Sequence, residues 1–138
     1  MTELKLRATE TSDIDVIASA VQDSIFQIGQ TRYDVDGRSF TLRLSRFRHE
    51  SQKPERIECG LRFDGVMSVK SQGVETDKKD AFAVILGLKF LAEDGLSGHF
   101  NLNLAGGGVI RLDVEAIDLT LADRGKARPT KHIPAHDG

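Results

Sequence analysis

Hydrophobic and polar residues alternate with two different periods along the chain, and these periods predict one helix followed by strands. Leu4, Leu6 and Ala8 alternate with basic residues, which predicts a short first strand. Ser12 and Asp15 have the spacing of a capping box, so we expect a helix to begin there. The helix is predicted from a single apolar stripe at helical spacing, which consists of Ile14, Ile17, Ala18, Val21 and Ile25.

The later segments, up to the tail, are predicted to be strands, and several of them have the two-residue period. In "TRYDVDGRSFTLRL" the pair Asp36-Gly37 predicts a two-residue type I′ turn, since both central positions of that turn have positive φ. This turn places Tyr33 opposite Phe40, so that the apolar residues of both strands share a face. A strand over residues 57–63 comes next, and the sequence predicts either one long bulged strand through residue 69 or two short ones.

The segment "FAVILGLKFL" is apolar on both faces for several residues. Its β-branched and aromatic residues, and the strands on either side, favour a central strand over a helix. From residue 125 the sequence "GKARPTKHIPAHDG" has no periodicity, and we expect a disordered basic tail over residues 125–138 after a single domain over residues 1–124.

Three consecutive glycines, Gly106 to Gly108, are the stretch most like a phosphate-binding loop. They belong to no phosphate-binding motif, and a strand rather than a helix follows them. A three-residue hairpin loop at these glycines makes one face of the hairpin apolar and the other polar. The pairs expected on the apolar face are Leu104 with Ile110, Leu102 with Leu112, and Phe100 with Val114. We therefore predict that the glycines only turn the chain.

These elements predict an α+β fold with one N-terminal helix. The helix packs on a mostly antiparallel, curved sheet or partly closed barrel of six to eight strands. Short hairpins between strands argue against a parallel, doubly wound enzyme fold.

Composition adds limits to the function and location. The chain has 138 residues and a formal net charge of −2, with no apolar run long enough for a membrane helix and no signal peptide at its start. Cys59 is the single cysteine, which excludes an intramolecular disulfide and favours a cytoplasmic protein without contact to a membrane. Basic residues are concentrated in residues 32–62 and in the tail, and residues 63–123 are acidic.

No set of residues in the sequence predicts catalysis, a cofactor or a metal. Cys59 lies on the apolar face of its strand with Ile57 and Leu61, and a cysteine at such a position is usually a small buried hydrophobic residue. His99 is expected opposite Glu115 on a polar face, as a surface pair. His132 and His136 have the H-x-x-x-H spacing, but the proline between them disfavours a helix and no further ligand lies near. We leave enzymatic activity undecided and lean against it.

Arginines and one aromatic residue alternate in "RLSRFRHE". Arg43, Arg46 and Arg48 together with Phe47 are the candidate anion-binding residues, because arginines bind phosphates and an aromatic ring stacks on a base. The alternative is a solvated strand face with cross-strand pairs from these arginines to Glu55 or Glu58.

Several stretches resemble a known family. They are "LSRFRHE", "GLRFDGVMSVKSQGV" and "NLNLAGGGVIRLDVEAIDLTLAD", and the similarity to the alphaproteobacterial family called domain of unknown function 2948 extends over nearly the whole chain. The resemblance implies a bacterial cytoplasmic protein and provides no activity, cofactor or functional residue.

The sequence therefore favours a non-catalytic binding or assembly module. Its partner is expected to be another protein or a second copy of the chain, through a sheet edge or the apolar side of "FAVILGLKFL". The alternative function is binding of RNA or another polyanion through the arginine-rich strand face.

Overall fold

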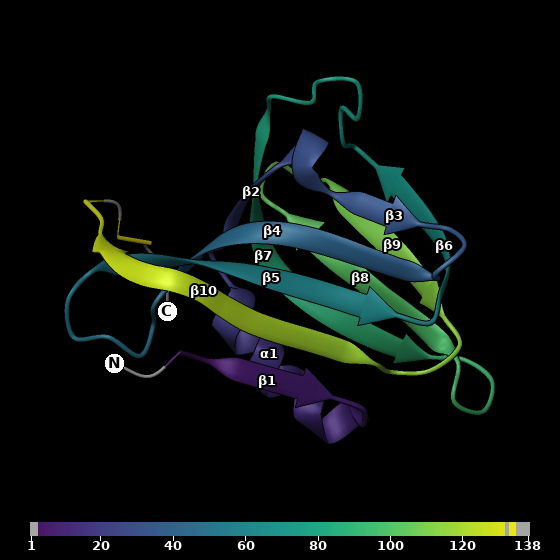
Figure 1. The fold of residues 1–138 in the computed structure, drawn as a ribbon. Helices are drawn as coiled ribbons and strands as arrows, with labels where there is room; N and C mark the ends of the chain where they lie inside the picture. Colours follow the sequence, from purple (N-terminus) through teal and green to yellow (C-terminus); the bar gives the residue numbers. More distant parts are fainter. Residues whose placement is uncertain (1–2, 132, 135–138) are drawn as a thin grey trace.

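The computed structural model describes residues 3–131 and 133–134, and these residues form one antiparallel sheet with one α-helix (Figure 1). The elements in chain order are β1 (Lys5–Ala8), α1 (Thr11–Val21), β2 (Ile25–Gln27), the 3-10 turn η1 (Ile28–Gln30), β3 (Arg32–Asp34), β4 (Ser39–Phe47), β5 (Glu55–Asp64), β6 (Val66–Gln72), β7 (Phe82–Ala92), β8 (Gly98–Leu104), β9 (Val109–Val114) and β10 (Leu119–Pro129).

The sheet folds over on itself into two layers. Strands neighbour one another in the order β1-β10-β5-β4-β2-β7-β8-β9-β6, and β3 pairs with β4 beyond the end of β2. Strands β1, β10, β5, β4 and β3 make the front layer of Figure 1, and β7, β8, β9 and β6 lie behind them. The short strand β2 joins the layers at one side, because it pairs with both β4 and β7. Helix α1 contacts β1, β4 and β7 and covers one end of the space between the layers.

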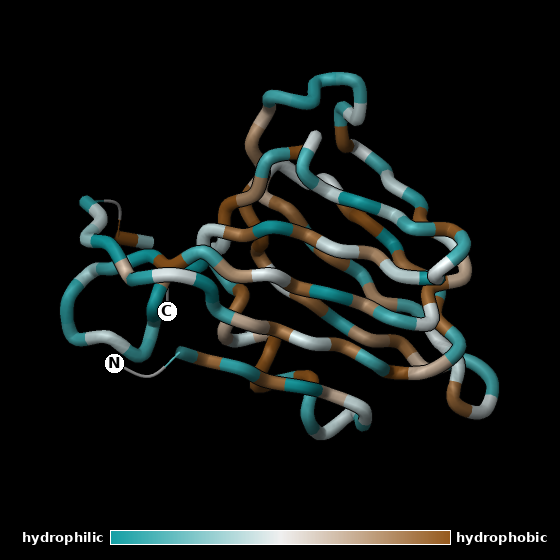
Figure 2. The backbone as a smooth tube through the Cα atoms, viewed as in Figure 1, coloured by the Kyte–Doolittle hydropathy of each residue, from teal (hydrophilic) through white to brown (hydrophobic). Residues whose placement is uncertain are grey.

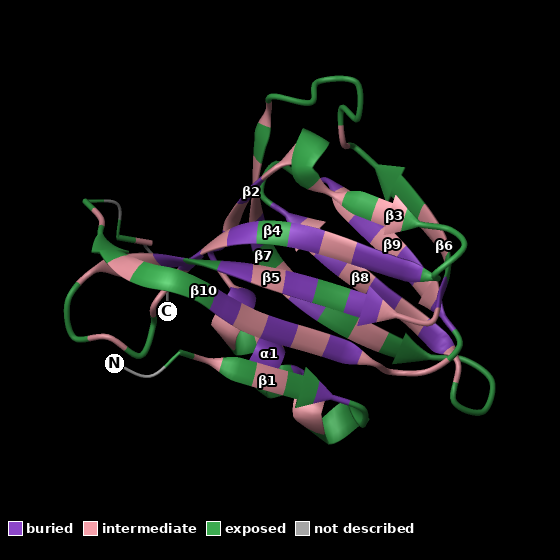
Figure 3. Ribbon diagram, viewed as in Figure 1, coloured by how far each residue is buried: buried purple, intermediate pink, exposed green. Residues whose placement is uncertain are grey.

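The core lies between the two layers. Alternate residues of β4, β5, β8, β9 and β10 are buried, so that buried and less buried bands alternate along these strands in Figure 3 and hydrophobic and hydrophilic bands along the tube in Figure 2. Three phenylalanine rings form the centre, where Phe63 lies 5.0 Å from Phe100 and 6.5 Å from Phe40 between ring centroids. The alternation of hydrophobic and polar residues in the sequence therefore predicts correctly which residues of these strands lie in the core.

The predicted class is confirmed, but the strand count is wrong. The sheet has ten strands rather than six to eight, and it is not closed into a barrel. The short strand β2, whose first residue had been assigned to the helical stripe, adds to the count. None of the helices in the described residues is long and apolar enough to span a membrane.

Helix α1 differs from the prediction at both ends. Ile14, Ile17 and Val21 are buried as expected, but the N-cap is Glu10 and its side chain makes no capping hydrogen bond, so the capping box is absent. The helix ends at Val21 because Asp23 has a positive φ of 70° and turns the chain into a strand. Ile25, predicted on the helical stripe, lies in β2.

The hairpin between β3 and β4 has the predicted register and a different turn. Tyr33 pairs with Phe40, as expected. The residue with positive φ is Arg38 (52°), however, and neither Asp36 nor Gly37 has one, so the turn is not type I′. The Gly37 N–H donates instead to Asp34 Oδ1 at 3.0 Å, which holds a wider loop.

The glycines turn the chain between β8 and β9, one residue earlier than predicted. The Leu104 N–H donates to the Gly108 carbonyl at 2.8 Å, so the three-residue loop is 105–107, and Gly106 and Gly107 have positive φ. The apolar pairs are therefore Leu102 with Ile110 and Phe100 with Leu112, two residues away from the expected register. Because the shift is even, both faces keep their predicted character.

Strands β5 and β6 meet at Gly65. A positive φ of 70° at Gly65 separates β5, in the front layer, from β6, which pairs with β9 in the back layer.

The last strand is longer than predicted. Of the predicted disordered tail, residues 125–129 belong to β10, where Arg128 and Pro129 pair with β5. Residues 132 and 135–138 of that tail, with His132 and His136, lie outside the described residues.

Candidate functional site

The four predicted anion-binding residues lie on β4 and just after it, and they do not face one way. Residues alternate along a strand between its two faces, and Leu42, Leu44 and Arg46 point inward. Arg43 points outward, with an exposed side chain (65%), whereas the Arg46 side chain has no exposed surface (0%). The predicted set is therefore corrected: Arg46 is a core residue and does not contact an anion in solvent.

Arg46 binds two carboxylates. Its Nε and Nη2 donate to Asp123 Oδ1 and Oδ2 at 2.9 and 2.8 Å, and its Nη1 and Nη2 donate to Glu50 Oε1 and Oε2 at 2.9 and 2.8 Å. Burial opposes the charge of Arg46, but the hydrogen bonds to Glu50 and Asp123 outweigh it and raise the pKa of Arg46. The hydrogen bond from Arg46 lowers the pKa of Glu50 to about 2. We call Arg46, Glu50 and Asp123 the buried ion cluster.

Arg48 and Phe47 also have partners within the protein. Arg48 donates to Glu55 at 2.7 Å, which is one of the two cross-strand pairs considered above. The Phe47 ring lies 5.7 Å from the guanidinium carbon of Arg56 and 5.1 Å from the His49 ring. These contacts make Phe47 and Arg48 part of the β4–β5 end of the sheet.

A signal for the buried ion cluster is present in the sequence. Arg46 continues the inward phase of Leu42 and Leu44, and Asp123 continues the inward phase of Leu119 and Leu121. Two opposite charges at core positions of two strands predict a buried pair. That Asp123 and Arg46 meet depends on the strand order, which the sequence does not state.

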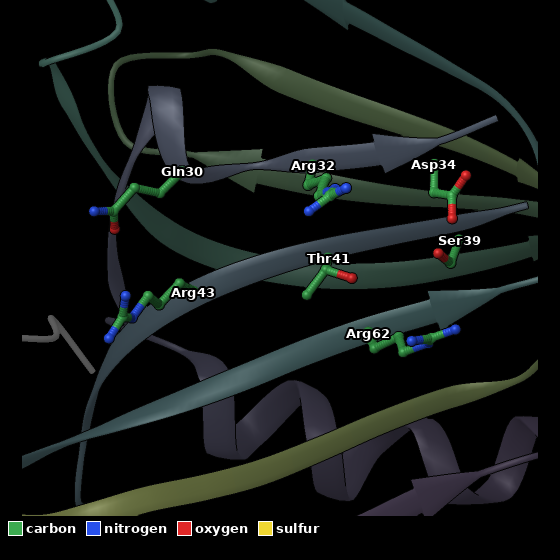
Figure 4. Close-up of a pocket in the computed structure, with 7 residues that line it drawn as sticks. All are labelled: Gln30, Arg32, Asp34, Ser39, Thr41, Arg43 and Arg62. Atoms are coloured by element: carbon green, nitrogen blue, oxygen red, sulfur yellow. The ribbon is translucent and has the colours of Figure 1, made fainter. Parts of the chain in front are cut away.

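An arginine groove of about 400 Å³ lies on the outward face of β3, β4 and β5 (Figure 4). The register forms it, because Thr41 pairs with Arg32 on one side and with Arg62 on the other. We define the arginine groove by its lining residues, which are Gln30, Arg32, Asp34, Ser39, Thr41, Arg43 and Arg62.

The three arginines of the groove differ in their partners. Arg43 Nη2 lies 3.4 Å from Glu58 Oε2, and Arg62 Nη2 lies 3.0 Å from Asp64 Oδ1, and both arginine side chains are exposed. Arg32 is exposed and has no ion pair or side-chain hydrogen bond with any described residue. Exposed pairs contribute little stability, so a bound anion can replace them at small cost. The groove thus offers one free and two weakly held guanidinium groups, beside a threonine hydroxyl.

Cys59 does not have the environment of a nucleophile. It lies between Leu44 of β4 and Asp123 of β10 in the register and is buried. Burial, together with the charge of Asp123, raises the pKa of Cys59 to about 12, so the thiol is neutral at physiological pH.

Glu93, His99 and Asp113 are the one group in the described residues with ligand atoms close enough for a metal, all within 4.8 Å of one another. Arg111 already supplies positive charge there, at 2.9 Å from Asp113 and 3.7 Å from Glu93. Hydrogen bonds from Ser68 and Arg111 lower the pKa of Asp113. His99 pairs with Asp113 rather than with Glu115, as had been expected, and lies 3.0 Å from Glu93. With Lys70 Nζ at 3.9 Å from Asp113, two cations face the two carboxylates, and the cluster is a neutralised surface network.

The comparisons identify the family. Residues 4–136 match the model of the family described as "Protein of unknown function (DUF2948)", which covers most of the chain, so the protein belongs to that family. No curated protein matches the chain. No solved structure matches it either.

Proposed function

We propose that this member of the DUF2948 family is a non-catalytic binding module that holds an anionic, phosphate-bearing ligand in the arginine groove. The observation that carries the proposal is Arg32, an exposed guanidinium without a partner among the described residues, facing Thr41 and Arg62 across two strand pairs. Guanidinium groups bind phosphate oxygens in a bidentate manner, and a threonine hydroxyl adds a donor.

This site keeps one of the residues predicted from the sequence and replaces the others. Arg43 lines the groove, while Arg32 and Arg62 take the places expected for Arg46 and Arg48. Binding is favoured over catalysis because the groove lacks a histidine or cysteine, and its one carboxylate, Asp34, holds a backbone N–H of the β3–β4 turn.

Titration with tripolyphosphate tests the proposal. Arg32→Gln combined with Arg62→Gln removes two donors and should weaken binding about tenfold or more, since charge-assisted hydrogen bonds are strong. Lys89→Gln is the matched control, because Lys89 is exposed on β7 in the other layer. Equal weakening by the control, or wild-type protein that does not bind, would refute the proposal.

A second candidate function is assembly with a protein or a second copy. Strand β7 leaves three large apolar side chains exposed, namely Phe82 (70%), Leu86 (49%) and Leu91 (45%). Sedimentation of the wild type and of Leu86→Glu tests self-assembly: an oligomer that the variant dissociates supports it, and a monomeric wild type argues against it.

We also propose a bacterial cytoplasmic location and an origin in the alphaproteobacteria. The lone cysteine is compatible with a reducing compartment, and the origin rests on the family resemblance. Fractionation of native cells, with detection of the protein by antibody, tests the location.

A further inference from the structure

The arginine groove is one part of a longer row of side chains. The register places Arg32, Thr41 and Arg62 side by side on β3, β4 and β5. The same row continues through Thr120 of β10 to Arg7 of β1. Arginine and threonine therefore alternate across five neighbouring strands, and we call these five residues the Arg–Thr row.

All members of the row face outward. The inward neighbours on these strands, Phe40, Leu61 and Leu121, are buried. The arginine side chains are exposed, with 67% for Arg7 and 56% for Arg62. Four strand spacings of about 4.8 Å make the row roughly 19 Å long. A stacked single strand has one phosphate per about 3.4 Å of its axis, so the row faces about six phosphates.

The two borders of the row differ in character. On one side lie Asp34, Asp64 and Asp118, and two of them pair with row arginines, at 3.4 Å for Arg7 with Asp118 and 3.0 Å for Arg62 with Asp64. These carboxylates repel a polyanion from that border. On the other side Gly60 and Ala122 pair with each other. Their side chains are so small that the surface is shallow there, and a Cβ on Gly60 would meet nothing within 4 Å. We call these two residues the floor.

We infer that the Arg–Thr row binds the phosphodiester backbone of a single-stranded nucleic acid across the strands, with its bases over Gly60 and Ala122. This inference rests on the proposed function of the arginine groove and extends it from a phosphate-bearing ligand to a chain. A carboxylate polymer lacks flat rings to cover the floor, and therefore fits the surface less well.

The closing experiment measures the binding of labelled uridine and thymidine oligomers of increasing length, from dinucleotides to decamers, by fluorescence anisotropy. Affinity should rise steeply up to about six nucleotides and more slowly beyond that length. The slope of log affinity against log salt should be about −3 for four phosphates neutralised by the row arginines and Arg43, at roughly −0.7 for each.

Variants at the far end of the row separate this inference from the proposed function. Arg7→Gln and Thr120→Val should weaken a hexamer and leave tripolyphosphate binding unchanged, and Arg7→Gln should reduce the magnitude of the salt slope by about 0.7. Gly60→Val places methyl groups on the floor, where a Cβ has room, and should weaken the oligomers alone. Lys89→Gln is again the control, and an unchanged thermal unfolding curve verifies that each variant is folded.

The possible outcomes distinguish the extended row, its ligand and the proposed function of the groove. If Arg7→Gln and Gly60→Val leave the hexamer affinity unchanged while Arg32→Gln lowers it, the extended row is refuted and the groove remains. If polyglutamate binds as tightly as the oligomers, the nucleic-acid ligand is refuted. If tripolyphosphate and oligomers both fail to bind, the proposed function falls with the inference. Preference for uridine or thymidine oligomers identifies RNA or DNA as the source of the backbone.

Discussion

Arg43 and Arg46 lie on the same strand, three residues apart, and have opposite environments. Arg43 is 65% exposed and lies beside one carboxylate at 3.4 Å, whereas Arg46 is fully buried and binds two carboxylates through four hydrogen bonds. The odd spacing puts them on opposite faces of β4. Strand phase therefore decides which arginine stabilises the fold and which is free to bind a ligand.

The largest effect is expected from breaking the buried ion cluster. Arg46→Ala leaves Asp123 buried without its counter-charge, and loss of one partner of a buried pair costs about 3–5 kcal/mol. Urea unfolding measures the loss in the free energy of unfolding. If Arg46→Ala does not fold, Arg46→Met keeps a long unbranched side chain in the core and provides the comparison. A loss no larger than that of Arg43→Ala would contradict the assigned role.

Replacing both charges tests whether the loss comes from an unpaired charge. Arg46→Met with Asp123→Leu removes the pair together, and should recover about half or more of the stability lost in Arg46→Ala, since buried pairs exchange with apolar residues at small net cost. The Leu4 N–H loses its acceptor, Asp123 Oδ2, so recovery is incomplete. The same urea experiment decides, and a double variant less stable than Arg46→Ala would contradict the explanation.

The sequence predicts the faces of the strands better than it predicts their partners. Alternation identified the core residues of β4 and β5 and the apolar face of the glycine hairpin. The hairpin register was wrong by two residues because Gly106 and Gly107, and not Gly108, adopt the positive φ of the turn. Gly108 is small for another reason, since a Cβ there would lie 3.1 Å from the Gly73 carbonyl oxygen. Contacts between segments far apart in the chain, such as this one, leave no local pattern.

The candidate site shows the same limit. Basic residues on β4 indicated an anion-binding face, but the prediction grouped Arg43 with Arg46, although the two-residue period puts Arg46 on the inward face with Leu42 and Leu44. The extent of the Arg–Thr row depends on β10 lying between β5 and β1, which only the structure provides. For the same reason the final residues of β10 were assigned to a tail, since their pairing partners lie on β5.

Glu50 is the exposed member of the buried ion cluster, and it should make the stability of the fold depend on pH. The folded-state pKa of Glu50 is about 2, below the usual value of 4.5, so Glu50 stabilises the fold above about pH 4.5. That contribution is lost as the pH falls from about 4.5 towards 2, because the unfolded state takes up the proton first. Since the Glu50 side chain is 46% exposed, we expect about 1 kcal/mol.

Glu50→Gln provides the measurement. The free energy of unfolding of the wild type should exceed that of Glu50→Gln near neutral pH, and the difference should shrink as the pH falls through about 4. The exposed pair Arg43–Glu58 serves as the reference. For Glu58→Gln, the difference from the wild type in the free energy of unfolding should show no comparable change with pH. A difference between wild type and Glu50→Gln that stays constant down to about pH 3 would contradict the role of Glu50.

The smallest effect on stability is expected at Arg43. Arg43→Ala removes an exposed pair with Glu58, and such pairs contribute about 0–1 kcal/mol, so the free energy of unfolding should change by less than about 0.5 kcal/mol. Its effect on ligand binding should nevertheless be clear, because Arg43 lines the arginine groove. Tripolyphosphate affinity should fall several-fold while the urea midpoint stays constant. Arg43→Lys keeps the charge but not the forked donors, and should restore part of the affinity. If Arg43→Ala instead lowers stability as much as Arg46→Ala, the two faces of β4 do not divide stability from binding.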